Sequence, residues 1–179
     1  MKRIAWIFVL ALVMGLVPAM ADSWSWTFTP TDLPLVEAWG TISGTSVAPG
    51  EYNIDNGTIH ENTLKDTGLL VANPTNSTTP WAVSIFQYDD QLYPTANPLL
   101  DSYGLLFQTT GGVYINIWGG DGSGTAPGAG SYTKYFSDGS ISPVNGTFAI
   151  VATPDGGTTL SLLGLALVGL AGLRRKLSL

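Results

Sequence analysis

The chain has 179 residues, no cysteine, one histidine and a formal net charge of −6. These counts exclude disulfides, thiol nucleophiles and thiolate metal sites, and they exclude a multi-histidine zinc site within one chain. Between residues 22 and 152, two basic residues face twelve acidic ones, and the resulting charge of −10 repels phosphate backbones, so we expect no nucleic-acid partner.

The N-terminal end has the three parts of a secretory signal peptide. A positive region at Lys2 and Arg3 precedes an apolar run over residues 4–17. Ala19 and Ala21 form an Ala-x-Ala site, so we expect export through the general secretory translocon and cleavage by signal peptidase after Ala21. A retained membrane anchor is the alternative, but the run is short for a membrane span.

The central part alternates short apolar or aromatic runs with turn residues. The first run places Trp24, Trp26 and Phe28 on one face, as expected for a half-buried strand. The expected strands are residues 23–29, 38–44, 50–54, 68–71, 81–88, 104–108, 113–118, 131–136 and 147–152. The expected turns are Pro49-Gly50, Asn56-Gly57, Asp121-Gly122, Asp138-Gly139 and Asn145-Gly146. This pattern, without a convincing amphipathic helix, predicts an all-β fold, namely an antiparallel β-sandwich or jelly-roll-like domain.

Aromatic residues are the first candidates for a binding surface. The tryptophans of the central part could form a flat platform for sugar rings, although alternating aromatics more often fill a core. Trp118 is the expected exception, because it lies at a strand end beside Gly119-Gly120. We therefore name Trp118 as the possible ligand platform.

Acidic residues are the second candidates. Asp89, Asp90 and Asp101 flank a proline-containing loop, and carboxylate oxygens suit calcium. We favour solvated turn carboxylates over a calcium site, and we expect no cofactor. No spacing singles out a pair of carboxylates for glycoside hydrolysis, and His60 lies in a polar stretch typical of a surface histidine. We expect no catalytic residue and no enzymatic activity.

The C-terminal end combines a polar motif, an apolar run and a basic cluster. The motif is Pro154, Asp155, Gly156 and Gly157, and the cluster is Arg174, Arg175 and Lys176. As a helix, the apolar run between them spans ~24 Å, less than the ~30 Å hydrocarbon core. The basic cluster is expected to stay cytoplasmic, with the helix as a temporary anchor in the inner membrane. A permanent membrane tail is the alternative.

This order of parts resembles the PEP-CTERM class of sorting signals, which membrane enzymes called exosortases recognise in Gram-negative bacteria. The nearest variant reads Val-Pro-Asp-Gly-Gly or Val-Pro-Asp-Ser-Gly, and here Thr153 replaces the valine. The resemblance implies export, transient anchoring, cleavage near the motif and delivery to the cell surface or extracellular matrix. Residues 88–132, including Asn116-Ile117-Trp118-Gly119, more weakly resemble the β-rich body of proteins with such tails.

The sequence therefore predicts three parts: a signal peptide over residues 1–21, an exported β-sandwich domain over 22–152 and a sorting signal over 153–179. The first hypothesis is a structural protein of the cell envelope or matrix, processed by an exosortase, with exopolysaccharide of a biofilm as a candidate partner. A carbohydrate-binding module is the second hypothesis, and a secreted glycoside hydrolase is the third.

Overall fold

The described part of the chain is built from β-strands. The computed structural model describes residues 22–32, 35, 37–75, 79–119, 131–139, 141–153 and 164. The strands are β1 (Asp22–Pro30), β2 (Ala38–Ala48), β3 (Glu51–Glu61), β4 (Asp66–Leu70), β5 (Trp81–Val83), β6 (Phe86–Tyr88), β7 (Gln91–Leu92), β8 (Leu105–Thr109), β9 (Tyr114–Gly119), β10 (Tyr132–Phe136) and β11 (Val144–Ala152).

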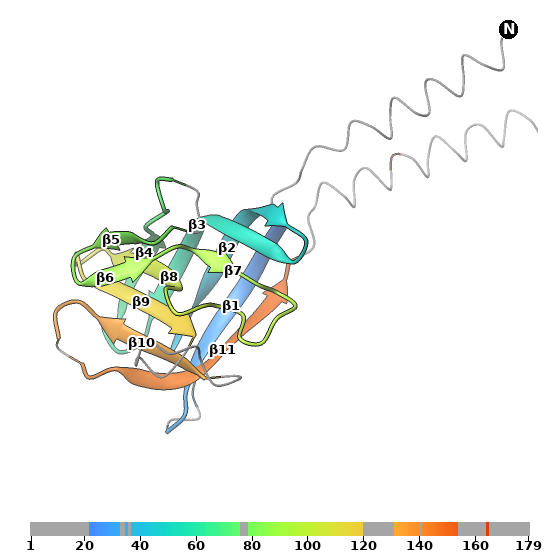
Figure 1. Ribbon diagram of the computed structural model, residues 1–179. Helices are drawn as coiled ribbons and strands as arrows, with labels where there is room; N and C mark the ends of the chain where they lie inside the picture. Colours follow the sequence, from blue (N-terminus) through green and yellow to red (C-terminus); the bar gives the residue numbers. More distant parts are fainter. Residues whose placement is uncertain are drawn as a thin grey trace, which may run out of the picture.

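Eight of these strands close into an antiparallel barrel (Figure 1). The order around the wall is β2-β1-β11-β10-β9-β8-β4-β3, and β3 returns to pair with β2. The prediction of an antiparallel all-β fold is confirmed. The prediction of a sandwich or jelly roll is wrong, because β2 pairs with both β1 and β3 and so joins the two ends of the sheet.

Small residues on the inner face of β2 let the barrel close. A Cβ atom added at Gly40 would lie 1.9 Å from the carbonyl oxygen of Thr58 on β3, and one at Gly44 would lie 2.3 Å from that of Asn53. The indole nitrogen of Trp26 also donates to the Thr58 carbonyl, at 3.2 Å. Strands β2 and β3 therefore approach each other more closely than larger side chains at these positions would permit.

The barrel interior is the main hydrophobic core. As the alternating pattern predicts, Trp24, Trp26 and Phe28 of β1 are buried there. The ring of Trp26 lies 5.3 Å from that of Phe107 and 5.6 Å from that of Phe148, between centroids. Burial of these large rings is the main stabilising contribution to the fold.

A second, smaller core lies outside the barrel. Strands β5 and β6 form a hairpin on the outside of the barrel (Figure 1). Its Phe86 and Tyr88 pack with Leu106, an outward-facing residue of β8. Residues 81–88 are predicted as one strand, but the chain reverses at Ser84, whose φ is 56°. The hairpin thus covers part of the outer wall.

Two predicted turns lie inside strands. Asn56-Gly57 belongs to β3 and Asn145-Gly146 belongs to β11. At both sites the glycine packs closely against a neighbouring strand: a Cβ at Gly57 would lie 3.1 Å from the Thr41 oxygen, and one at Gly146 2.4 Å from the Thr29 oxygen. The glycines therefore serve strand packing rather than chain reversal.

The chain enters and leaves the barrel at the same end. Strand β1 pairs with β11 in the register Trp24↔Ala152, and the Thr153 amide donates to the Ser23 carbonyl at 2.8 Å. The described strands begin at Asp22 and end at Ala152. The predicted signal peptide, and the predicted terminal helix apart from Gly164, lie outside the described residues.

Candidate functional site

A groove on the outer wall is a candidate ligand site. It lies beside the β5–β6 hairpin and has a volume of about 550 Å³. Its lining comes from three separate stretches of chain: residues 85–87, Ser102 and Tyr103, and Asn116 and Trp118 of β9. Ile115 and Ile117 belong to the interior core. Because side chains alternate along a strand, Asn116 and Trp118 therefore point outward. The groove therefore brings the predicted residue Trp118 together with polar partners that lie far away in sequence.

Asn116 carries an unsatisfied polar atom at this groove. Its side-chain nitrogen donates to the Gln87 carbonyl at 3.2 Å. This bond sets the orientation of the amide, since the reverse orientation would oppose two carbonyl oxygens. The amide oxygen, Oδ1, is buried and has no hydrogen-bond donor among the described residues. A buried acceptor without a donor is rare in folded proteins and calls for a specific explanation.

The chemistry of the groove is that of recognition. Its described lining contains indole, phenol and phenyl rings, an isoleucine, two amides and a serine hydroxyl, and none of these described residues carries a carboxylate, amine or imidazole. Such groups stack and hydrogen-bond, whereas glycoside hydrolysis requires a pair of carboxylates. The groove as described therefore fits a ligand site better than a hydrolytic centre.

Two of the three predicted aspartates meet. Asp89 is buried, and burial, the charge of Asp101 and a hydrogen bond with Asp101 raise the pKa of Asp89 to about 8. Asp89 Oδ1 accepts from the Gln91 amide at 3.2 Å, and Asp101 Oδ1 accepts from the amides of Tyr103 and Gly104. Burial beside a second carboxylate thus favours the protonated form of Asp89.

Asp90 contacts different partners. Its Oδ2 accepts from the Asn73 amide at 2.9 Å and its Oδ1 from the Leu106 amide at 3.3 Å. Burial raises the pKa of Asp90 to about 8, although these two amides act in the opposite direction. Among the described residues, no group of three or more histidine, cysteine, aspartate or glutamate residues is arranged to hold a metal ion. The aspartates fasten the chain before β7 and β8 to the barrel.

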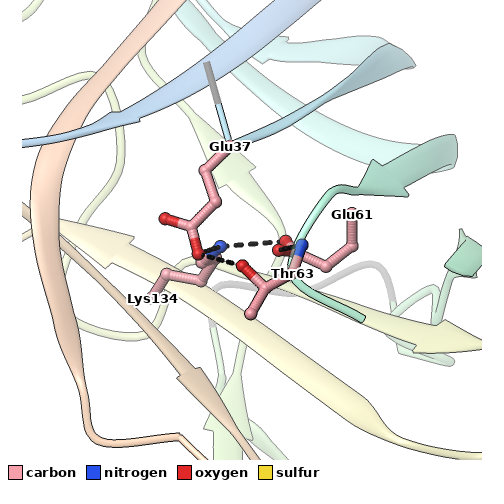
Figure 2. Close-up of polar contacts among 4 residues, drawn as sticks. All are labelled: Glu37, Glu61, Thr63 and Lys134. Carbon is pink, nitrogen blue, oxygen red and sulfur yellow. Dashed lines mark hydrogen bonds and ion pairs between the residues drawn. The ribbon is translucent and has the colours of Figure 1, made fainter. Parts of the chain in front are cut away.

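A buried ion-pair cluster lies at the end of the barrel remote from the chain termini. Figure 2 shows Lys134 with Glu37, Glu61 and Thr63 around it. Lys134 Nζ lies 2.9 Å from Glu37 Oε1 and 2.9 Å from Glu61 Oε2, and the Lys134 side chain is completely buried. It also lies 5.3 Å and 5.0 Å from the ring centroids of Phe28 and Phe136. Thr63 donates its hydroxyl to Glu37 Oε1 at 2.6 Å and its amide to Glu61 Oε1 at 3.1 Å.

The charge balance of this cluster is uneven, with two carboxylates around one ammonium. Burial raises the pKa of Glu61, while the charge of Lys134 opposes that rise. Glu37 Oε2 has no hydrogen-bond donor among the described residues. Sequence reasoning missed this cluster, although one signal was available: Lys134 alternates with Tyr132 and Phe136, so it occupies the inner face of a strand.

The remaining candidates divide between the surface and the undescribed parts. His60 is exposed and stacks on Trp39 with ring planes 10° apart. The signal-cleavage residues Ala19 and Ala21 lie outside the described residues. So do the motif residues Pro154, Asp155, Gly156 and Gly157 and the basic residues Arg174, Arg175 and Lys176. Within the described ranges, no helix has the length and apolar character needed to cross a membrane.

The decisive comparison concerns the C-terminal end. Residues 154–177 match the family described as VPDSG-CTERM motif. This segment is an exosortase sorting signal of the PEP-CTERM-like type. The match begins at Pro154, one residue after the point where Thr153 departs from the usual valine. The resemblance predicted from the motif is confirmed. Curated proteins and solved structures gave no significant match to the chain.

The VPDSG-CTERM motif indicates how the chain is exported and processed. The signal is that of an exported protein processed by an exosortase, and it is consistent with a surface or extracellular destination. The matched segment begins two residues after β11 ends at Ala152. The sorting signal therefore follows the barrel almost directly.

Proposed function

We propose that this protein is a non-enzymatic structural component of the cell envelope or extracellular matrix. A signal peptide at residues 1–21 directs export, the C-terminal helix anchors the chain transiently in the inner membrane, and the exosortase releases it. The observation that carries this proposal is the VPDSG-CTERM motif at residues 154–177. Exopolysaccharide of a biofilm matrix is the partner that we propose for the released barrel.

The position of the motif supports release of an intact domain. Among the described residues, no strand extends beyond Ala152, and Thr153 makes one backbone bond to Ser23. Cleavage at or beyond Pro154 therefore removes no described strand pairing. Without cysteine, the released barrel relies on its closed sheet and its core rather than on disulfides.

Mass spectrometry of the protein from its native host tests this route. We expect a mature chain that begins at Asp22 and ends near residue 157 in the wild type, and a longer chain in a strain without the exosortase. Asp155→Ala is expected to leave the chain unprocessed, whereas Asp55→Ala, at an exposed position in β3, serves as the matched control. A wild-type chain that retains residues 160–179 would refute the proposal.

A carbohydrate-binding module is the second candidate function. The observation that favours it is the half-buried Trp118 beside Asn116 in the outer groove. A glycoside hydrolase has less support, because no carboxylate lines this groove and the Asp89 carboxyl of the aspartate pair is buried.

A further inference from the structure

We propose that the outer groove beside the β5–β6 hairpin binds an uncharged glycan, with one sugar ring against Trp118 and the sugar hydroxyls toward the side-chain amide of Asn116. The inference deepens the proposed function and rests on it in one respect: only an exported protein meets the polysaccharides of the envelope or matrix.

Aromatic side chains supply the first part of the argument. Trp118 and Tyr103 both line the groove, and both are half-buried, so each ring is held by the protein while part of its surface stays open. Aromatic rings with one apolar and one wet side suit ligands that are themselves amphipathic. A sugar ring, with an apolar face of C–H groups and a rim of hydroxyls, has this character.

The orphan acceptor supplies the second part. Asn116 Oδ1 has no donor among the described residues, and its orientation is set by the bond from its amide nitrogen to the Gln87 carbonyl. A group that completes the site must therefore bring a hydrogen-bond donor rather than an acceptor. Hydroxyl groups donate, and a glycan presents several in different directions. Ser102 and Gln87 add further polar groups at the same groove.

The charge of the groove and its surroundings is the third part of the argument, and it favours an uncharged glycan over an anionic one. Among the described residues, the lining contains no basic side chain that could neutralise a uronic acid or a sulfate ester. Residues 22–152 carry twelve acidic residues against two basic ones, and the lysine on β10 is completely buried. An anionic polysaccharide would therefore be repelled, and an uncharged one is the ligand that fits.

Size agrees with this class. The volume of about 550 Å³ falls within the range of roughly 300–1,000 Å³ usual for small-ligand sites. The groove is open along the wall rather than enclosed, so a polysaccharide chain can pass through it without a free end.

Binding of the full chain, purified in detergent, to neutral polysaccharides tests the inference. Dextran, laminarin, mannan and galactomannan serve as probes in affinity electrophoresis and titration calorimetry, with alginate as the anionic control. We expect at least one neutral probe to bind and alginate not to bind. Trp118→Ala is expected to weaken binding by about tenfold or more. Trp39→Ala and Trp81→Ala, at tryptophans that are 38% and 45% exposed outside the groove, are expected to leave it unchanged.

Two further variants keep the test sharp if Trp118→Ala does not fold. Tyr103→Ala removes the second ring, and Asn116→Leu removes the acceptor; each is expected to weaken binding while the far-ultraviolet circular dichroism stays native. Binding by none of the neutral probes, or binding lost in Trp39→Ala but kept in Trp118→Ala, would overturn the inference. Exosortase-dependent trimming without glycan binding would defeat this inference alone, whereas glycan binding without trimming would defeat the proposed route alone.

Discussion

Lys134 Nζ and Glu61 Oε2 lie 2.9 Å apart at a position where neither side chain is exposed to solvent. Lys134 comes from the middle of β10 and Glu61 ends β3, so the pair links strands on different sides of the barrel. A buried ion pair contributes little net stability, but removal of one partner leaves an uncompensated charge.

We therefore expect Lys134→Met to lower the free energy of unfolding by about 3–5 kcal/mol. Because methionine fills a similar volume, the loss of stability reflects the two uncompensated carboxylates rather than a cavity. Urea denaturation followed by tryptophan fluorescence measures it. Lys65→Met, the same change at an exposed lysine, is the control and is expected to alter stability by less than about 0.5 kcal/mol.

A double variant separates charge from packing at this cluster. Adding Glu61→Gln to Lys134→Met removes one of the two uncompensated carboxylates and is expected to recover part of the lost stability. A double variant less stable than Lys134→Met would contradict the charge explanation.

The stability of the protein is expected to fall as the pH rises from about 5 to about 8. Asp89 and Asp90 each have a pKa of about 8 in the folded protein, against an ordinary value of 3.8. The folded state therefore binds these protons more tightly, and their contribution is complete below pH 3.8 and lost as the pH passes about 8. We therefore expect the free energy of unfolding to decrease across this window.

Asp89→Asn tests the origin of that dependence. The amide of asparagine can donate to Asp101 without a titrating proton, so the slope of stability against pH is expected to become shallower. Urea titrations at a series of pH values measure the slope, with Asp55→Asn as the exposed control. A slope equal to that of the wild type in Asp89→Asn would exclude protonation of Asp89 as the cause. Asp66, whose pKa is lowered to about 2 by hydrogen bonds from Thr110, Gly111 and Thr67, titrates below the window.

Gly40→Ala is expected to destabilise the barrel by roughly 1–3 kcal/mol or more. The new Cβ would lie 1.9 Å from the Thr58 oxygen, so strands β2 and β3 must separate. That movement also stretches the bond from the Trp26 indole to Thr58. Thermal unfolding together with near-ultraviolet circular dichroism of the tryptophans measures both effects. Gly112→Ala is a less crowded comparison, since no atom lies within 4 Å of its added Cβ, although its φ of 84° adds local strain.

The sequence predicts the strands better than their closure. Trp24, Trp26 and Phe28 alternate strictly, so the inner face of β1 can be recognised without a structure. A sandwich and a barrel share this alternation and the same spacing of turns, and only the pairing of β2 with β3 distinguishes them. The inward-facing glycines of β2 are the sequence feature that reflects closure of the barrel. A glycine in a strand, however, predicts a bulge or a close approach equally well.

Of the residues that line the candidate groove, only one could be predicted from the sequence. Trp118 stands out at a strand end, whereas Tyr103 and Gln87 reach the groove from a loop and from the β5–β6 hairpin. Their convergence depends on packing between Phe86, Tyr88 and Leu106, which no local pattern specifies. The same limit applies to the Lys134 cluster, since its three charged groups come from separate segments.

The pairing of β1 with β11 also determines when folding can finish. The two strands lie at opposite ends of the domain, and their contact Trp24↔Ala152 is among the most distant in sequence. Until β11 arrives, β1 and β10 each present an unpaired edge, which is a hazard for aggregation. A chain that crosses the membrane from its N-terminus therefore completes its barrel only after its final strand has emerged, next to the segment that the exosortase recognises.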